Sequence, residues 1–189
     1  APGDAPGDTP IADMPCKSQT NFGGSAGSTY NITPGRYCGG MRVQRNVNMA
    51  PGTYIIDGGD LDVTSTASLV GSGVTFYMTG GGTIKMNGSS YVNVTAPATG
   101  GYSGVLVFVD RDDPYQQHVI NGNNVSEVNG AIYSSSGHIQ MLGGSTAGGG
   151  CTQVVGRTVG FSGNSGVGVD CTGTGVRDIR SSRIISLVE

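Results

Sequence analysis

Short runs of β-favouring residues recur along this chain at a nearly constant spacing, and this recurrence limits what the chain can fold into. Each run follows a glycine or another small residue. Counted from Tyr54, the runs begin at intervals of about 20 to 31 residues. The later runs begin at Gly73, Gly104, Gly130 and Gln153. A repeat of this length predicts a stacked, repetitive architecture rather than a mixed fold.

A second series of runs is interleaved with the first, and its apolar residues are two positions apart, as in Leu61/Val63 and Ile139/Met141. Interleaved strand series with one common period are typical of a three-faced parallel β-solenoid. We therefore predict an all-β fold, a single right-handed parallel β-helix of roughly seven coils with three short strands in each coil. The alternative is a β-sandwich, in which Asn87-Gly88 and similar pairs would form hairpin turns.

Glycine accounts for 35 of the 189 residues, and each interior glycine costs a helix about 1 kcal/mol relative to alanine. In a solenoid, glycine supplies corners that need a positive φ. The stretch from Val176 to Glu189 fits either an amphipathic helix or a terminal strand, and its β-branched residues favour the strand. The side chains expected in the core are Tyr54, Ile56, Val74, Phe76, Ile84, Met86, Val105, Val107, Ile132, Ile139, Met141 and Phe161.

The sequence predicts one domain. Residues 1–15 contain a duplicated Ala-Pro-Gly-Asp and are expected to be a flexible linker or a cloning remnant. Residues 16–189 are expected to form the β-helix. No apolar run approaches the roughly 18 residues that a membrane span needs. Because the chain begins with Ala1 instead of Met, we expect a processed or excised piece.

The four cysteines form two local pairs, Cys16 with Cys38 and Cys151 with Cys171. Their separations of 22 and 20 residues match the repeat, so each pair is expected to bridge adjacent coils. No C-x-x-C motif or histidine cluster suggests zinc, and disulfides are favoured over free thiols. Disulfides imply an oxidising compartment, so we expect an extracytoplasmic protein, in the periplasm or at the cell surface.

The net charge is −3, with acidic and basic residues scattered, which argues against a nucleic-acid partner. No helix is expected after the glycine-rich stretches, so they are not phosphate-binding loops, and we expect no cofactor. His118 and His138 lie 20 residues apart and would make a weak metal site if they stacked on one face. No third ligand is evident, so we expect no metal.

The densest charged cluster is Asp110-Arg111-Asp112-Asp113, which follows a very apolar strand. It lies where the repeat is interrupted, and the loop continues to His118. Specific recognition by solenoids usually comes from such interruptions. The candidate partner-binding residues are Arg111, Asp112, Tyr115, Gln116 and His118. A solvated insertion without function is one alternative, and the other is a polysaccharide-active site formed by Asp110, Asp112 and Asp113.

Several short sequence segments of the chain resemble those of a known protein family. They include Pro34-Gly35-Arg36-Tyr37-Cys38, Ala50-Pro51-Gly52-Thr53-Tyr54, Gly104-Val105-Leu106-Val107-Phe108 and Ser186-Leu187-Val188-Glu189. From about Cys16 onward, the chain resembles the C-terminal region of TadE/TadG-like proteins of bacterial tight-adherence (Flp) pili. Such proteins usually carry a membrane-anchoring helix, so a membrane anchor would come only from a segment absent from this chain. The resemblance implies a pilus-associated role and assigns no catalytic residue.

Taken together, we expect a non-enzymatic, extracytoplasmic structural or adhesion module associated with a surface pilus. Its expected partner is a pilus or cell-surface protein, with a glycan as a second kind of partner. The alternative function is that of a small polysaccharide-active or polysaccharide-binding β-helix.

Overall fold

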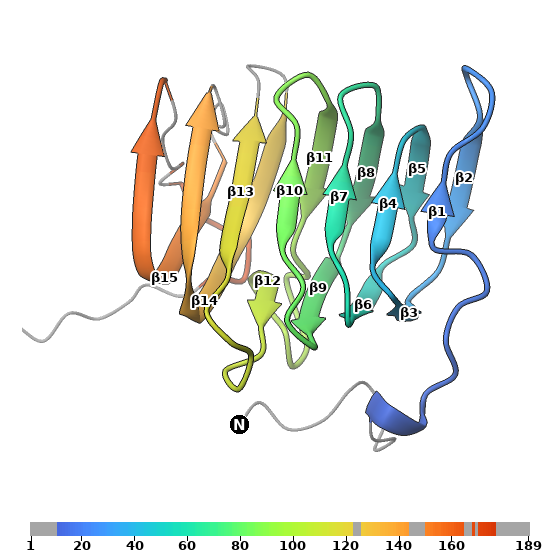
Figure 1. Ribbon diagram of the computed structural model, residues 1–189. Coiled ribbons are helices and arrows are strands. Elements are labelled where there is room, and N and C mark those ends of the chain that lie inside the picture. The colour runs from blue at the N-terminus through green and yellow to red at the C-terminus, as the bar shows by residue number, and fades with distance from the viewer. Residues whose placement is uncertain (1–10, 123–125, 144–149, 165–167, 169, 177–189) are drawn as a thin grey trace, which may run out of the picture.

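The computed structural model describes residues 11–122, 126–143, 150–164, 168 and 170–176. Within these ranges the chain is a parallel β-solenoid of about six turns, slightly fewer than expected. The turns pass through a lower, a front and a rear face as drawn in Figure 1. All pairings of the described strands are parallel, so the predicted solenoid is confirmed and the hairpins of a sandwich are not found among them.

Three sets of strands form the three faces. The front face contains β1 (Asn21–Phe22), β4 (Met41–Val43), β7 (Leu61–Val63), β10 (Ile84–Met86) and β13 (Gln117–Gly122). The rear face contains β2 (Thr29–Ile32), β5 (Asn46–Met49), β8 (Ser68–Ser72) and β11 (Tyr91–Thr95). The lower face contains β3 (Gly35–Cys38), β6 (Gly52–Asp57), β9 (Val74–Thr79) and β12 (Val105–Val109). Two longer strands turn corners between the faces, β14 (Glu127–Gly143) and β15 (Thr152–Ser162).

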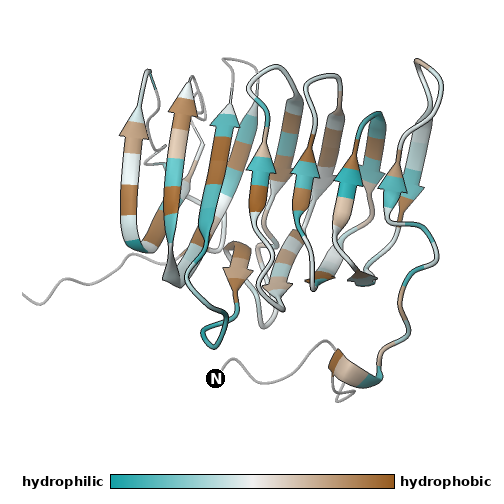
Figure 2. Cartoon of the chain, viewed as in Figure 1, coloured by the Kyte–Doolittle hydropathy of each residue, from teal (hydrophilic) through white to brown (hydrophobic). Residues whose placement is uncertain are grey.

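The core is the interior of the solenoid, and every second side chain of a typical strand enters it. In β7, Leu61 and Val63 are buried while Asp62 between them points outward. Figure 2 shows this alternation of hydrophobic and hydrophilic residues along the strands. Since each inward side chain lies above its counterpart in the preceding coil, the core is a set of stacked rows.

Aromatic rings make one of these interior rows. Tyr37 and Tyr54 are stacked with ring centroids 5.8 Å apart, and Phe76 follows at 6.2 Å from Tyr54. The buried Tyr54 hydroxyl donates to the Ala50 carbonyl oxygen at 2.8 Å, and the Tyr37 hydroxyl donates to the Thr33 carbonyl oxygen at 2.7 Å. These bonds satisfy polar groups that would otherwise destabilise the core.

Ten of the twelve side chains predicted to face the core are buried, and two predictions were wrong. Val105 is only partly buried, because a bulge in β12 turns both Leu106 and Val107 inward instead. Phe161 is 51% exposed. It lies on β15, beyond which no further described strand stacks, so it has a neighbouring coil on one side only.

Glycines at the corner between the lower and front faces let successive coils approach closely. A Cβ atom on Gly59 would lie 2.3 Å from the carbonyl of Gly39, and one on Gly82 would lie 1.8 Å from the Gly59 carbonyl oxygen. At Gly82 the requirement is therefore steric. Any side chain here would collide with the backbone of the preceding coil.

Replacing Gly82 by alanine should destabilise the protein by about 1–3 kcal/mol, since the coils must move apart to admit the methyl group. Chemical denaturation measures this free energy of unfolding. The matched control is Gly101→Ala, because a Cβ atom there meets nothing within 4 Å. That substitution should change stability by less than about 0.5 kcal/mol. Equal stability of the two variants would contradict close packing at this corner.

The N-terminal boundary differs from the expected one. Residues 11–15 were expected to belong to a linker, but the 3-10 helix η1 (Ile11–Asp13) begins within them. Arg36 donates from Nη1 to the carbonyl oxygens of Ala12 and Met14, at 2.9 and 3.1 Å, and its Nη2 lies 2.5 Å from Asp57 Oδ2. This segment is therefore fastened to the first coils. The rest of the predicted linker, residues 1–10, lies outside the described residues.

Two loops interrupt the regular winding, as predicted. Residues 96–104 connect β11 to β12, and residues 110–116 connect β12 to β13. The second of these, the β12–β13 loop, contains four of the five predicted partner-binding residues, and the fifth, His118, lies in β13. The predicted terminal strand at 183–188 lies outside the described residues. In the described part of the chain, no helix is long and apolar enough to cross a membrane.

Candidate functional site

The β12–β13 loop, residues 110–116, leaves the corner between the lower and front faces. Figure 1 shows it projecting below the neighbouring coils. Other connections at this corner are shorter, such as the one between β6 and β7. An insertion at a corner can project without breaking the stacking of strands on either side, because the strands before and after it keep their register.

Asp110 holds the first half of the loop. Its Oδ2 accepts hydrogen bonds from the Tyr77 hydroxyl at 3.0 Å and from Thr79 Oγ1 at 3.3 Å. Its Oδ1 accepts from the backbone N–H of Asp112 at 3.1 Å. The loop is thus fastened by its own first carboxylate to the preceding coil.

Asp113 holds the second half. Its Oδ1 accepts from the backbone N–H of Gly80 at 2.9 Å, whereas its buried Oδ2 has no hydrogen-bond partner. Burial raises the pKa of this carboxyl group, and the negative charges of Asp110 and Asp57 raise it further, against the lowering effect of the N–H groups of Gly81 and Gly80. The structural carboxylates of the loop are therefore Asp110 and Asp113.

Three of the predicted partner-binding side chains are exposed to solvent. Arg111 and Asp112 lie on the outside of the loop, and Tyr115 is 56% exposed. Gln116 is half-buried, and its carbonyl oxygen accepts a hydrogen bond from the His138 N–H at 2.8 Å. The structure brings these four residues onto one loop, as the sequence predicted.

Arg111 also caps an external row of aromatic rings. Its guanidinium carbon lies 5.5 Å from the ring centroid of Tyr133. The rings of Tyr77, Phe108 and Tyr133 are stacked on the lower face, with centroid separations of 5.6 and 5.1 Å. Cation–π contacts at exposed positions contribute about 0.5–1 kcal/mol, so Arg111 is positioned by this contact yet accessible. This row was not predicted from the sequence, although its members follow one another at about the repeat spacing.

His118 was predicted to bind a partner, and this prediction was wrong. Its side chain is only 1% exposed, because it points into the solenoid at the start of β13. The Ile84 N–H donates to its Nδ1 at 3.2 Å, and its Nε2 lies 3.2 Å from Ser134 Oγ. With Nδ1 accepting, the neutral ring carries its proton on Nε2, facing Ser134. Burial lowers the pKa of the imidazole.

The two histidines do not stack. His138 pairs with Gln117 in the neighbouring strand, one position away from His118, so the two rings point to opposite sides of the sheet. His138 Nδ1 lies 2.7 Å from Thr158 Oγ1, and its Nε2 lies 3.1 Å from Gln140 Oε1. Among the residues that the structure describes, no group of three or more His, Cys, Asp and Glu side chains is arranged to hold a metal ion.

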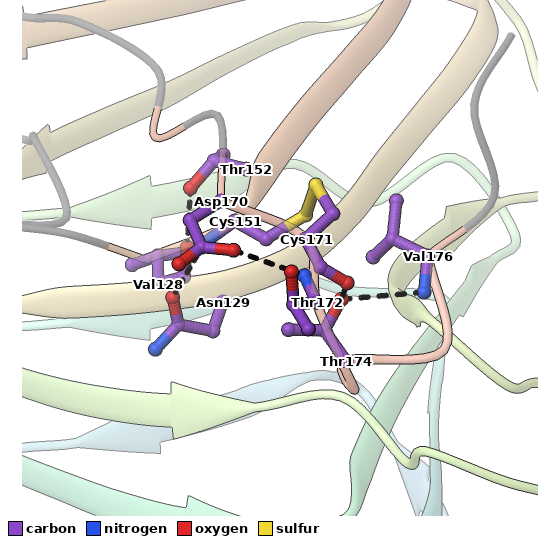
Figure 3. Close-up of a disulfide and its surroundings, with 9 residues drawn as sticks. All are labelled: Val128, Asn129, Cys151, Thr152, Asp170, Cys171, Thr172, Thr174 and Val176. Atoms are coloured by element: carbon purple, nitrogen blue, oxygen red, sulfur yellow. Dashed lines mark hydrogen bonds between the residues drawn. A yellow bond between two sulfur atoms is a disulfide. The ribbon is translucent and has the colours of Figure 1, made fainter.

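Both predicted disulfides are present. Cys16 pairs as an isolated bridge with Arg36, so its bond to Cys38 joins adjacent coils of the lower face. Cys151 is fully buried before β15 and bonds to Cys171 (Figure 3). Each bond closes a loop of about one coil, which stabilises the fold by about 3 kcal/mol in the chain-entropy model. Two disulfides indicate an oxidising environment.

The second disulfide holds the chain that follows the last described coil. The carbonyl oxygen of Cys171 accepts a hydrogen bond from Thr174 Oγ1 at 2.8 Å, as drawn in Figure 3. The Thr172 N–H donates to Asp170 Oδ1 at 3.1 Å and thereby lowers the pKa of that carboxyl group. A side chain on Gly104 would collide with the backbone at Gly175, so this segment packs closely on the 96–104 loop.

No protein-family model, no curated protein and no solved structure matches this chain. The resemblance to TadE/TadG-like proteins therefore stays a prediction based on the quoted phrases alone.

The buried His118 should make stability depend on pH. Its folded pKa is lowered, so below the unfolded value of about 6.5 the unfolded chain takes up a proton that the folded chain does not. The free energy of unfolding should fall with decreasing pH from about 6.5, by up to about 1.4 kcal/mol per unit. Denaturation measured between neutral and mildly acidic pH tests this.

The matched variants are His118→Gln and His138→Gln. The first should flatten the pH dependence below neutrality whatever its effect on absolute stability, since the titrating group is gone. The second should retain it. If His138→Gln flattens the curve and His118→Gln does not, the assignment of the titrating histidine is wrong.

Proposed function

We propose that this chain is a non-catalytic extracytoplasmic module of the bacterial surface that binds a partner through the β12–β13 loop. The observation that carries the proposal is the solvent exposure of Arg111, Asp112 and Tyr115 on a loop whose own carboxylates fasten it to the solenoid. Tyrosine and arginine are the side chains most enriched at binding hot spots.

Preorganisation of the loop supports a binding role. Asp110 and Asp113 hold the loop through bonds to Tyr77, Thr79 and Gly80. Because the loop is ordered before a partner arrives, little conformational entropy is lost when it binds. The exposed side chains are thus presented in one geometry, which favours specific recognition.

The kind of partner is proposed from the compartment and the family resemblance. The two disulfides are consistent with the periplasm or the cell surface. The resemblance to TadE/TadG-like proteins favours a subunit of a tight-adherence pilus or another surface protein as the partner. A structural or adhesive role fits a rigid solenoid with a projecting loop.

A cell-binding assay tests the role proposed for the β12–β13 loop. Bacterial cells that display tight-adherence pili serve as the probe, and pilus-free cells of the same strain serve as the reference. The double variant Tyr115→Ala/Arg111→Ala should lose binding to the piliated cells. Its free energy of unfolding should stay within about 1 kcal/mol of that of the unmodified protein, because replacing exposed side chains usually changes stability little.

The matched control is the double variant Tyr91→Ala/Arg157→Ala, which removes an exposed tyrosine and an exposed arginine elsewhere on the solenoid. It should bind as well as the unmodified protein. Normal binding by the Tyr115/Arg111 variant, or its unfolding, would show that the loop is structural.

One observation favours a second candidate function, action on a polysaccharide through Asp110, Asp112 and Asp113. The raised pKa of the Asp113 carboxyl group is a property of general acids. A screen of acidic and neutral polysaccharides for cleavage, with and without calcium, tests this function. Cleavage that Asp112→Asn abolishes would favour the enzyme, and the binding proposal predicts that no polysaccharide is cleaved.

A further inference from the structure

Two hollows lie next to each other on the front face, and none of the residues that line them belongs to the β12–β13 loop. One has a volume of about 500 Å³ and the other about 320 Å³. Arg42 of β4 and Asp62 of β7 line both. The smaller hollow begins beside Asn21 of β1, and the larger extends to Val119 of β13. Together they form an open groove that crosses five neighbouring strands, and we call it the front groove.

One row of outward side chains runs along the front groove in strict register. Arg42 pairs with Asp62, Asp62 with Lys85, and Lys85 with Val119. Neighbouring strands are about 4.8 Å apart, so this row offers one side chain at each such step along the solenoid. A ligand that repeats at a similar step can place successive units opposite successive side chains of this row.

The charges of the front groove cancel. Arg42 Nε lies 3.3 Å from Asp62 Oδ2, and Lys85 Nζ lies 2.6 Å from Asp60 Oδ2. Asp60 also accepts from the backbone N–H and the hydroxyl of Thr83, at 2.8 and 2.7 Å. Burial raises the pKa of Asp60, but the bonds from Lys85 and Thr83 outweigh it and the pKa is lowered. Two cations thus face two ionised carboxylates, so a ligand with a net charge gains no overall attraction.

The cations are the outer members of both pairs. The side chains of Arg42 and Lys85 are 56% and 57% exposed, against 33% for Asp62 and 39% for Asp60. Exposed ion pairs of this kind contribute only about 0–1 kcal/mol to stability, so they rearrange easily to admit a ligand. The groove therefore offers hydrogen-bond donors and acceptors side by side without a large cost for opening them.

The groove also has apolar surface and open access. Val119 follows Lys85 in the row and is only partly buried, so it offers apolar surface to a ligand. At the edge of the smaller hollow, Gly39 and Gly40 carry no side chain.

We propose that the front groove binds a neutral polysaccharide that lies along the solenoid axis. A sugar ring with two adjacent hydroxyl groups matches a side-by-side cation and carboxylate, since one hydroxyl accepts from Arg42 and the other donates to Asp62. The next sugar reaches Lys85 and Asp60, and a third packs its C–H face on Val119. A sugar unit is about as long as the step between coils, so successive sugars can face successive side chains of the row. The site is separate from the β12–β13 loop and does not depend on the function proposed for it.

Binding of neutral hexasaccharides tests this proposal. The probes are cellohexaose, mannohexaose and xylohexaose, and the acidic comparison is a hexamer of galacturonic acid. Calorimetric titration of the whole chain should show binding of at least one neutral probe, stronger than that of the acidic one. Amide chemical shifts measured with the same probe should change along Arg42, Asp62, Lys85 and Val119.

Arg42→Ala and Asp62→Ala should each lower the affinity for the neutral probe at least about tenfold, because each variant loses hydrogen bonds to a charged group. Asp62→Asn removes the charge with little change in shape and should also weaken it. The matched control is Arg157→Ala, an exposed arginine on β15, which should bind as the unmodified protein does. Denaturation midpoints establish that each variant is folded.

Four results would overturn the proposal. They are no binding of any neutral probe, preference for the acidic hexamer, unchanged binding by the folded Arg42 and Asp62 variants, and shift changes confined to another face. Each is independent of whether the β12–β13 loop binds piliated cells, so the two proposals can fail separately.

Discussion

The structure depends on the direct stacking of one coil's backbone on the next. Parallel hydrogen bonding holds neighbouring strands at a fixed separation of about 4.8 Å, and every coil must fit within that step. The coils approach each other most closely at the corner between the lower and front faces, where Gly59 and Gly82 have no room for a Cβ atom. Because the step is constant, residues one period apart in sequence become neighbours in space. The interior rows and the Cys16–Cys38 disulfide between neighbouring coils follow from this one constraint.

The same constraint determines where on the solenoid a functional site can form. Strand lengths can hardly change without disturbing the adjacent coils, so insertions are confined to corners, as residues 96–104 and 110–116 are. A corner insertion gives an irregular, projecting surface suited to a protein partner. The faces between the corners instead repeat one side chain per coil, and the row from Arg42 to Val119 is suited to a repeating ligand. The two proposed sites differ in kind because they lie on these two kinds of surface.

Much of the fold could be predicted because its determinants are local or periodic. Alternating apolar residues and glycine-rich turns indicated parallel coils, and cysteines about one period apart indicated the disulfides. The candidate loop was visible as an interruption of the period. The salt bridges of the front groove were not foreseen. Asp60 and Asp62 pair with Lys85 and Arg42, which are contributed by other coils.

The sequence by itself determined the period, the parallel solenoid, the cysteine pairing and the exposure of Arg111, Asp112 and Tyr115. Only the tertiary structure decided which alternate side chains face inward where the strands are irregular. A bulge in β12 turned Leu106 into the core in place of Val105, and His118, the second residue of β13, also points into the core. The reason is physical. A shift of one residue reverses the face of a strand, and such a shift depends on how a coil meets its neighbours, which no local pattern records.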